Sequence, residues 1–466
     1  MVTLSKKDKE WITPVTKSLI HERWEAYRMM NWTRHNYLKK KVKKEILKAK
    51  SLWADRMKTT QHGLWKLAKM IRHGPRDDDG FEHIITLEGG ITAVLQRLAL
   101  SCSSPDADSQ TTSNLQSDDD WNFEVTEEEV FRLLSKLNVK KSSGDERIPT
   151  KIYVTLADYI AKPLARIYND CITQRYFPDQ WKHGITIPVP KTKPVDLAKI
   201  RKITLLSPLG KILERLILRK AGDCFYSSYG STQHGFRRHA STTTALIELT
   251  HNVLSNYDKT KVSCIAIISF DFSQAFDAVS HRLLIQRLSD CDFPAGLIKL
   301  LCSYLCGRSS RIRLRKCMSE SFLVTRGVPQ GSVLGPPLFC VFTSDFCPKC
   351  LNTKLVKYAD DLSLVIPFKT DDPGVINQCI SEEVEHLRSW CSAKELHLNV
   401  DKSNIMFHSR RALHLTPSLP LPTVEATKVL GILFTKQLTW DAHCKAVCKK
   451  ANQRFYYLRR LKSVTT

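Results

Sequence analysis

Acidic residues stand at the ends of short apolar runs, and this placement constrains the fold more than any other feature of the sequence. The run Ser263–Phe270 (SCIAIISF) is short, apolar and β-branched, which predicts a buried strand that ends at Asp271. The runs Leu355–Tyr358 and Leu362–Ile366 flank Ala359-Asp360-Asp361, which predicts a hairpin with two acids at its tip. A carboxylate beside buried apolar residues is costly unless it is paired, so these acids need a partner.

A divalent cation is the partner that this pattern favours. Carboxylates that converge from different strands repel each other, and a bound cation removes that cost. Mg²⁺ prefers one or two carboxylates plus substrate phosphates, and two metal ions ~4 Å apart can hold the attacking and the leaving oxygen of a phosphoryl transfer. For Asp360-Asp361 taken alone, an ordinary surface turn remains the alternative.

The charge of the chain favours a polyanionic partner. Its 466 residues contain 71 Lys and Arg against 47 Asp and Glu, a formal net charge of +24. Phosphate contacts by Lys and Arg drive sequence-independent binding of nucleic acid, although composition alone fits a merely soluble basic protein equally well.

The cysteines and the start of the chain favour a reducing compartment. The 15 cysteines show no small-scaffold spacing, and Cys347-Pro-Lys-Cys350 lacks a second pair at the spacing of a zinc site. The first twenty residues have no signal-peptide core, and no apolar run approaches the ~20 residues of a membrane helix. We therefore expect reduced thiols and a protein of the nucleus or cytoplasm that is neither secreted nor in a membrane.

Composition also divides the chain. Residues 1–60 carry 16 Lys and Arg against 6 Asp and Glu, with apolar positions at helical spacing, which predicts basic amphipathic helices. Residues 101–120 are rich in Ser and Asp, which predicts a linker. After it, Thr126 and Glu129 form a capping-box pattern before a predicted helix, Glu127–Leu137. Residues 441–462 are predicted to end the chain as a basic helix.

An ordered series of motifs carries a specific resemblance. The series is Phe270-Asp-Phe-Ser-Gln-Ala-Phe-Asp277, Arg326-Gly-Val-Pro-Gln-Gly-Ser-Val-Leu-Gly-Pro336, Tyr358-Ala-Asp-Asp361, Leu398-Asn-Val-Asp-Lys402 and Lys428-Val-Leu-Gly-Ile432. It resembles the palm motifs of reverse transcriptases, and the upstream stretches Ile185–Lys191, Leu205–Ile217 and Gln233–Leu246 resemble non-LTR retrotransposons of the jockey kind. The resemblance covers roughly residues 125–460.

The resemblance assigns roles to individual residues. It implies that Asp271, Asp360 and Asp361 are catalytic and hold two Mg²⁺ (or Mn²⁺) ions together with the Phe272 backbone carbonyl. A nucleotide-binding role is implied for a further set, which comprises Lys191 and Arg201 on the triphosphate, Phe272, the steric gate Phe276, Gln330, Gly331, and Lys402 as a proton donor to pyrophosphate. Leu430 and Gly431 resemble a hairpin that grips the primer. Core packing is the alternative for Phe276, and solvated surface charges are the alternative for Lys191 and Arg201.

The resemblance also implies a fold and an activity. The expected fold is α+β: a right-hand polymerase with an antiparallel palm sheet, mixed fingers, a partial helical thumb and N-terminal helices. The expected activity is RNA-directed DNA polymerisation by a retrotransposon enzyme, with an RNA template, a DNA primer or target, and dNTPs as partners, in a nuclear or cytoplasmic ribonucleoprotein; the oligomeric state is open. A catalytically silent nucleic-acid-binding remnant is the alternative. An RNA-dependent RNA polymerase is disfavoured, because Ala359 rather than Gly precedes the paired acids.

The expected domains follow the same motifs. They are a basic helical region that resembles an endonuclease-to-polymerase linker (1–100), the linker (101–120), fingers and palm (121–435, core 170–435) and the start of a truncated thumb (436–466). On this basis the chain is expected to be an incomplete copy without the endonuclease of its full-length relatives. Arg201-Lys202, where the family usually has Arg-Pro, is a departure that would suit a decaying copy.

Overall fold

The computed structural model describes residue 8 and residues 11–58, 81–100, 121–191, 195–257, 262–409 and 419–465. The predicted linker at 101–120 lies outside these ranges. The chain forms two compact units, Met1–Asp79 with Asp441–Thr466, and Gly80–Trp440. No helix in the described ranges is both long enough and apolar enough to span a membrane.

The first unit is helical. Helix α1 (Pro14–Arg28) starts at Thr13, whose side chain accepts a hydrogen bond from the Thr16 N–H, and Pro14 occupies the first helical position, where it removes no helical hydrogen bond. Helix α2 (Trp32–Lys58) packs against α1 through Leu19, Ala26, Leu38 and Val42. Helix α17 (Asp441–Thr465) completes this unit.

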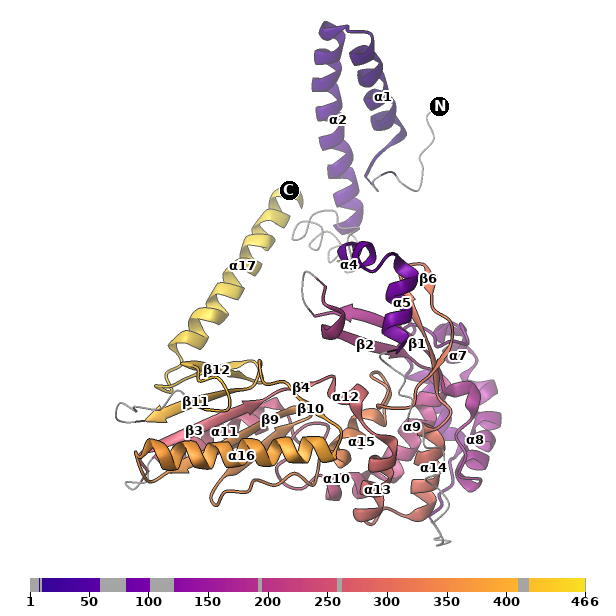
Figure 1. Ribbon diagram of the computed structural model, residues 1–466. Helices are drawn as coiled ribbons and strands as arrows, with labels where there is room; N and C mark the ends of the chain where they lie inside the picture. Colours follow the sequence, from indigo (N-terminus) through magenta and orange to yellow (C-terminus); the bar gives the residue numbers. More distant parts are fainter. Residues whose placement is uncertain are drawn as a thin grey trace. The chain divides into compact units, whose positions relative to one another are not determined.

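The second unit is built around a four-stranded antiparallel sheet in the order β11-β3-β9-β8 (Figure 1). Its strands are β3 (Cys264–Phe270), β8 (Lys354–Tyr358), β9 (Asp361–Phe368) and β11 (Asn404–Ser409). Residues 264–270 begin one position later than the predicted strand, and the acidic hairpin is formed by β8 and β9 as predicted.

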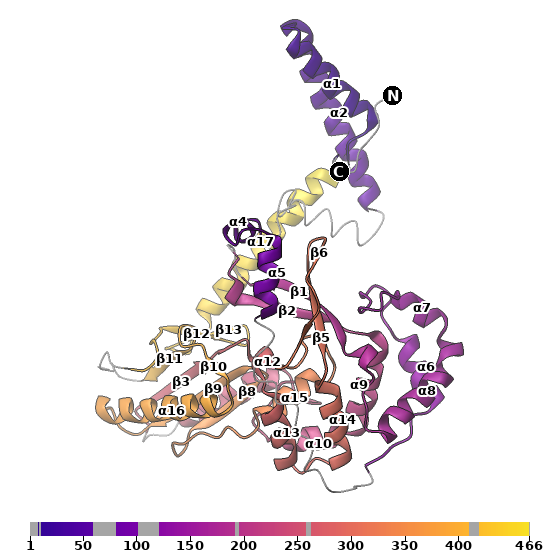
Figure 2. The same cartoon turned by 45° about the vertical axis from the view of Figure 1, so that its right-hand side comes forward.

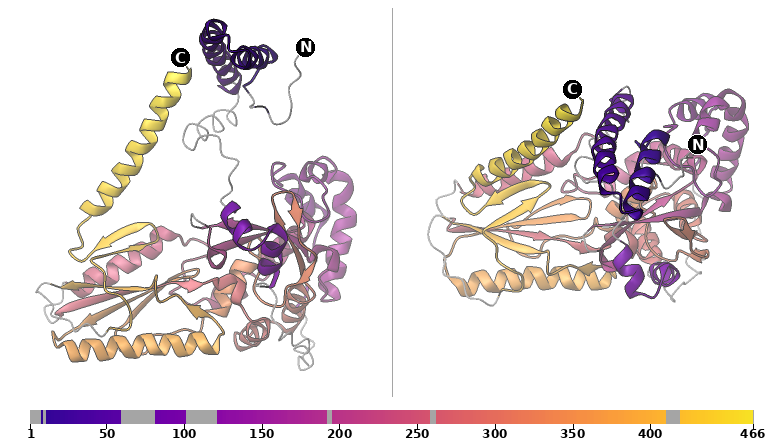
Figure 3. Two further views of the ribbon diagram at one scale, coloured as in Figure 1. Left: turned by 45° about the horizontal axis from the view of Figure 1, so that its top comes forward. Right: turned by 90° about the horizontal axis from the view of Figure 1, so that it is seen from above.

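Both faces of this central sheet are covered. Ala266, Ile268 and Phe270 belong to the large hydrophobic core that includes α16 (Pro373–Ala393), whereas Ile265 and Ile267 face α11 (Thr242–Tyr257). The two helices lie on opposite sides of the sheet in Figure 3. The small hairpin of β12 (Ala426–Val429) and β13 (Ile432–Thr435) shares the α11 side. Burial on both faces explains why β3 is continuously apolar rather than alternating.

A second, mixed sheet holds β1 (His183–Pro190) antiparallel to β2 (Ile200–Leu205) and parallel to β5 (Ser309–Leu314). The short strands β6 (Cys317–Met318) and β7 (Phe322–Leu323) pair with β5. Helices α4 (Glu82–Leu87) and α5 (Ile91–Leu100) belong to this unit, because Val94, Leu95 and Leu98 share a core with Ile200 and Ile312. Figure 2 shows α5 beside β1 and β2.

The remaining helices surround the large core. They are α6 (Glu127–Ser135), α7 (Thr150–Thr155), α8 (Ala157–Thr173), α9 (Pro208–Lys220), α10 (Gly222–Ser228), α12 (Ala275–Ala278), α13 (His281–Asp290), α14 (Ala295–Leu305) and α15 (Gly335–Phe342). The capping box that the sequence predicts at Thr126 and Glu129 is formed in both directions. A two-stranded sheet of β4 (Phe272–Ser273) and β10 (His397–Leu398) continues from the end of β3.

A buried carboxylate joins α9 to the loop that precedes α15. Glu214 is 2% exposed, and its Oε2 accepts hydrogen bonds from the N–H groups of Val333 (2.6 Å) and Leu334 (3.0 Å). Burial raises the pKa of Glu214, and these two donors and nearby Arg308 oppose the shift. This side chain therefore fixes the loop that carries Gln330 and Gly331.

We expect Glu214→Ala to lower the free energy of unfolding by about 2–4 kcal/mol, because two buried N–H groups lose their acceptor. Urea unfolding followed by circular dichroism measures the change. The matched control is Glu385→Ala on α16, whose carboxylate is largely exposed and 3.7 Å from Arg388, and which should cost less than about 0.5 kcal/mol. Equal losses in the two variants would contradict this account.

Candidate active site

Three acids meet at one edge of the central sheet. Phe270 of β3 pairs with Leu362 of β9, so Asp271 follows directly beside Asp361, which opens β9. Tyr358 pairs with Asp361 across the hairpin, and Ala359 adopts φ 56° at its turn. The structure therefore brings together the three acids that the sequence singles out.

The acids influence one another electrostatically. Burial first, then the negative charges of Asp360 and Asp271, raise the pKa of Asp361 to about 6. Burial and Asp271 likewise raise the pKa of Asp360, whereas Lys191 and Arg201 oppose the shift. The acidic edge therefore faces two cations of the mixed sheet.

The Leu398–Lys402 motif holds Asp271 in place. The Asn399 N–H donates to the Asp271 carbonyl (2.8 Å), and the Asp271 N–H donates to Ser403 Oγ (3.2 Å). Lys402 Nζ lies 3.3 Å from Asp271 Oδ2. Lys402 therefore contacts the acidic edge directly.

A cavity of about 260 Å³ adjoins the acids. Of the residues predicted from sequence, seven line it: Lys191, Arg201, Phe272, Phe276, Gln330, Gly331 and Asp360. They come from β2 and the residue after β1, from β4, from α12, from the β8–β9 turn and from the loop before α15. One wall is cationic and one is aromatic, and of the three acids Asp360 lines the cavity whereas Asp271 and Asp361 do not.

The ring of Phe276 is held between two other rings. It stacks on Phe339 with centroids 4.5 Å apart and meets Phe236 edge-on at 6.5 Å. Phe276 is only partly buried and lines the cavity. Phe276 therefore both packs against the large core and forms part of the cavity wall.

The Gln330-Gly331 loop approaches β2 closely. The Thr204 N–H donates to the Gln330 carbonyl at 2.8 Å. Gly331 has φ 121°, and a Cβ there would lie 2.6 Å from the Thr204 carbonyl oxygen. Only glycine satisfies both the backbone conformation and this contact.

Sequence reasoning gave no role to Asp277, which is partly buried and also lines the cavity. Gln330 Nε2 donates to Asp277 Oδ1 (2.9 Å), and Lys202 Nζ lies 3.9 Å from Asp277 Oδ2. Burial raises the pKa of Asp277, and Lys202 and Gln330 favour its charged form. The only sequence signal was its place at the end of the first acidic motif.

The predicted primer-grip residues do not line the cavity. Leu430 (φ 47°) and Gly431 (φ 92°) form the turn between β12 and β13, and Leu430 packs on the α11-side core. Lys402 also lies outside the cavity lining, at Asp271.

Within the described ranges, no group of three or more His, Cys, Asp or Glu side chains is close enough to hold a metal ion by itself. In this structure the three acids share one edge of the sheet but do not form such a group.

An antiparallel sheet with acids at one edge, beside a cavity with a cationic wall, fits the mixed α/β architecture of a right-hand polymerase. Residues 189–434, more than half of the chain, match the family model described as reverse transcriptase (RNA-dependent DNA polymerase). The chain belongs to this family.

Curated relatives agree with this assignment. The chain is 33% identical over 351 residues to the probable RNA-directed DNA polymerase from transposon BS of Drosophila melanogaster, which covers 72% of this chain and 38% of the relative. It is 30% identical over 336 residues to the RNA-directed DNA polymerase from mobile element jockey of the same species, over 68% of this chain and 36% of the relative. The chain thus spans little more than a third of either relative's length.

Two further matches are weaker. Apo telomerase from Candida tropicalis, truncated from its C-terminal domain, matches with a TM-score of 0.41 and 13% identity over 65% of this chain and 62% of that chain. Residues 440–465 match a model described as alkylated DNA repair protein alkB homolog 8, N-terminal, which covers little beyond α17.

The strand that leads to the acidic turn carries a buried lysine. Lys357 is 3% exposed, and its Nζ donates to the Thr343 carbonyl at 3.1 Å. Burial lowers the pKa of Lys357 from 10.5 to about 8. Between pH 8 and 10.5 the unfolded chain therefore binds more protons at this site than the folded chain, so Lys357 makes stability rise with pH.

We expect Lys357→Met to remove this rise. From pH 7 to pH 9.5 the free energy of unfolding of the native chain should rise by about 2 kcal/mol more than that of Lys357→Met. The reason is that protonated Lys357 opposes folding at the lower pH. Urea unfolding at several pH values measures the difference. Parallel curves for the two proteins would show that Lys357 titrates normally.

Proposed function

We propose that this chain is an RNA-directed DNA polymerase of a non-LTR retrotransposon, which adds dNTPs to a DNA 3′ end on an RNA template. The observation that carries the proposal is that seven residues, which sequence motifs assign to nucleotide or metal binding, line one cavity. The partners are an RNA template, a DNA primer or target end, and dNTPs. The place of action is a nuclear or cytoplasmic ribonucleoprotein.

The acidic edge is the site of nucleotidyl transfer in this proposal. Asp271, Asp360, Asp361 and the Phe272 carbonyl would hold two Mg²⁺ (or Mn²⁺) ions. When bound, these ions supply charge neutralisation at the attacking and leaving oxygens. The raised pKa values of Asp360 and Asp361 fit this role, because like charges at one edge are relieved by a cation.

The cavity walls position the nucleotide. Lys191 and Arg201 hold the triphosphate, and their charges stabilise the leaving pyrophosphate. The Gln330-Gly331 loop packs on the nucleotide and template base, where the absent Cβ permits close approach. Lys402, whose Nζ lies 3.3 Å from Asp271 Oδ2, would be the proton donor to the leaving pyrophosphate.

The remaining elements take the parts of a right-hand polymerase. The central sheet with α11 and α16 is the palm, and the mixed sheet with its helices forms the fingers. Leu430 and Gly431 in the β12–β13 turn grip the primer end. Helix α17, with exposed Lys445, Lys449 and Arg454, begins the thumb and contacts the duplex backbone. The α1–α2 helices represent the linker region before the polymerase.

Extension of oligo(dT) on poly(rA) tests the activity. We expect Mg²⁺-dependent incorporation of dTTP, which Asp360→Asn should reduce by about 10³-fold or more because one carboxylate charge is lost from the metal ligands. Asp271→Ala should behave similarly. The control is Asp158→Asn in the exposed first turn of α8, which should leave the rate unchanged.

The same experiment separates the alternative. Salt-sensitive RNA binding without extension by the native chain would support a catalytically silent nucleic-acid-binding remnant instead. Extension that persists in Asp360→Asn would contradict the assignment of the acids.

Phe276→Ala tests the gate. Because the Phe276 ring excludes a 2′-OH, we expect its removal to raise the relative kcat/KM for UTP over dTTP by about 10–100-fold. Single-nucleotide incorporation kinetics measure the ratio. Tyr159→Ala, an exposed aromatic residue on α8, is the control. An unchanged ratio would contradict the gate and indicate that Phe276 only packs against the core.

A further inference from the structure

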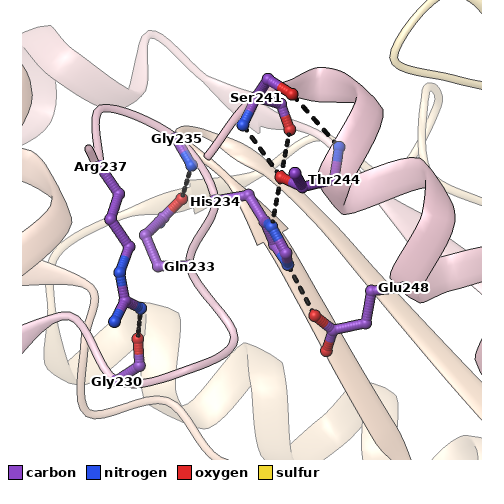
Figure 4. A network of polar contacts seen from close by, with 8 residues as sticks. All are labelled: Gly230, Gln233, His234, Gly235, Arg237, Ser241, Thr244 and Glu248. Carbon is purple, nitrogen blue, oxygen red and sulfur yellow. Dashed lines mark hydrogen bonds and ion pairs between the residues drawn. The ribbon is translucent and has the colours of Figure 1, made fainter. Parts of the chain in front are cut away.

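The segment Gly230–Arg237, part of which is drawn in Figure 4, is hydrogen-bonded to the strand that leads into the acidic turn. The Lys357 N–H donates to the Thr232 carbonyl (2.8 Å), and the His234 N–H donates to the Lys357 carbonyl (2.9 Å). Through these two bonds the segment pairs in parallel with the outer edge of β8, the strand at the end of the central sheet. The segment is thereby fixed to the hairpin by backbone contacts.

The Gln233 side chain reaches the turn itself. It is 1% exposed, and its Oε1 accepts hydrogen bonds from the N–H groups of Gly235 (2.7 Å) and Ala359 (3.0 Å). Ala359 has φ 56°, a conformation that costs a residue with a Cβ of order 1 kcal/mol. The Gln233 amide therefore stabilises the strained residue that directly precedes Asp360.

Gly235 allows this close approach. A Cβ on Gly235 would lie 2.4 Å from the Ala359 nitrogen, which is a backbone atom and cannot rotate away. Any side chain at position 235 would displace the turn or the segment. The contact between the segment and the turn therefore depends on a residue without a Cβ.

The next residue contacts the ring that lines the cavity. Phe236 has φ 55°, and its ring meets the Phe276 ring edge-on. Within four consecutive residues the segment contacts both the turn that carries two of the acids and the ring that lines the cavity. It is placed to hold these two parts of the site at a fixed separation.

The segment is itself anchored on α11. The His234 ring hydrogen-bonds through Nδ1 with Thr244 Oγ1 (2.9 Å) and through Nε2 with Glu248 Oε2 (2.8 Å). Arg237 donates to the Gly230 carbonyl (2.6 Å) and closes the loop. Figure 4 shows the His234 ring between Ser241–Thr244 and Glu248, and it shows the Arg237 side chain at the Gly230 carbonyl. The anchor gives the Gln233 side chain a rigid base.

We propose that Gln233 is a positioning residue that sets the geometry of Asp360 and Asp361 for cation binding and nucleotidyl transfer, with Gly235 providing the room. This inference rests on the proposed polymerase function. Gln233 itself touches neither nucleotide nor metal ion; it acts through Ala359.

The test compares Gln233→Asn, Gln233→Glu and the control Gln286→Asn in the full-length chain. Asn is one methylene shorter and cannot reach the Ala359 N–H, whereas Glu keeps an acceptor oxygen at the same distance. Gln286 lies on the exposed side of α13, where it bonds Asp290. All three proteins are first compared by melting temperature.

The first measurement is Mn²⁺ binding by electron paramagnetic resonance without nucleic acid. We expect Gln233→Asn to weaken Mn²⁺ binding at least fivefold and to lower kcat for dTTP incorporation about 10–100-fold, with KM changed less than threefold. Gln233→Glu should recover most of both, and Gln286→Asn should match the native chain. Mn²⁺ binding and kcat in Gln233→Asn that equal those of Gln286→Asn would overturn the proposal.

Gly235→Ala gives an independent reading, because it disturbs the same turn by a clash instead of a lost bond. It should also weaken Mn²⁺ binding and lower kcat; native values would overturn the proposal even if Gln233→Asn failed to fold. Gly374→Ala in the exposed first turn of α16, where φ is not positive and a Cβ would lie 3.2 Å from the Asp372 side-chain oxygen, is its control. If the native chain binds Mn²⁺ but incorporates no dTTP, the polymerase function fails, while the Mn²⁺ measurements still decide the role of Gln233.

Discussion

The pairing register of β3 with β9 is the constraint on which the site depends. It sets Phe270 opposite Leu362 and so places Asp271 beside the start of the acidic hairpin. A slip of β3 by one residue would move Asp271 by about 3.3 Å along the sheet and exchange the two faces of β3. The packing of alternate β3 residues against α16 and α11 opposes that slip, because each face has its own core. The chemistry at the edge is therefore specified by apolar packing in the interior.

The acidic edge is destabilising for the folded chain taken alone. Burial and mutual repulsion raise the pKa values of Asp360 and Asp361, and compensation comes from side chains of other elements: Lys191 and Arg201 across the cavity and Lys402 at Asp271. Strain is concentrated in the same place, since Ala359 has a positive φ. A fold that keeps charge repulsion and backbone strain together at one edge needs rigid support behind that edge, and the Gln233–Phe236 segment supplies it.

Local patterns in the sequence predicted the parts of the site that are local in structure. An apolar run that ends in an acid predicted β3 and Asp271, and Thr126 with Glu129 predicted the start of α6. The resemblance supplied the members of the cavity wall. Contacts that join distant parts of the chain were missed, even where a partner stands in a motif: the Gln233 bond to Ala359 joins residues 126 positions apart, and Cys350 Sγ lies 3.1 Å from Cys379 Sγ, which the CxxC spacing did not suggest. Such pairs depend on how elements pack, and a single sequence does not encode that in any local period.

The chain has Arg201-Lys202 where the family usually has Arg-Pro, and the alternation of side chains along β2 accommodates this difference. Neighbouring residues of a strand point to opposite faces, so Arg201 is exposed at the cavity while Lys202 is buried on the other side. There its ammonium group approaches Asp277, which also binds Gln330. A proline at position 202 would leave Asp277 without that cation, whereas the lysine compensates the partly buried charge of Asp277. The substitution thus changes the support of the cavity and leaves its cationic wall intact, so at this position the departure from the family pattern is no sign of a damaged site.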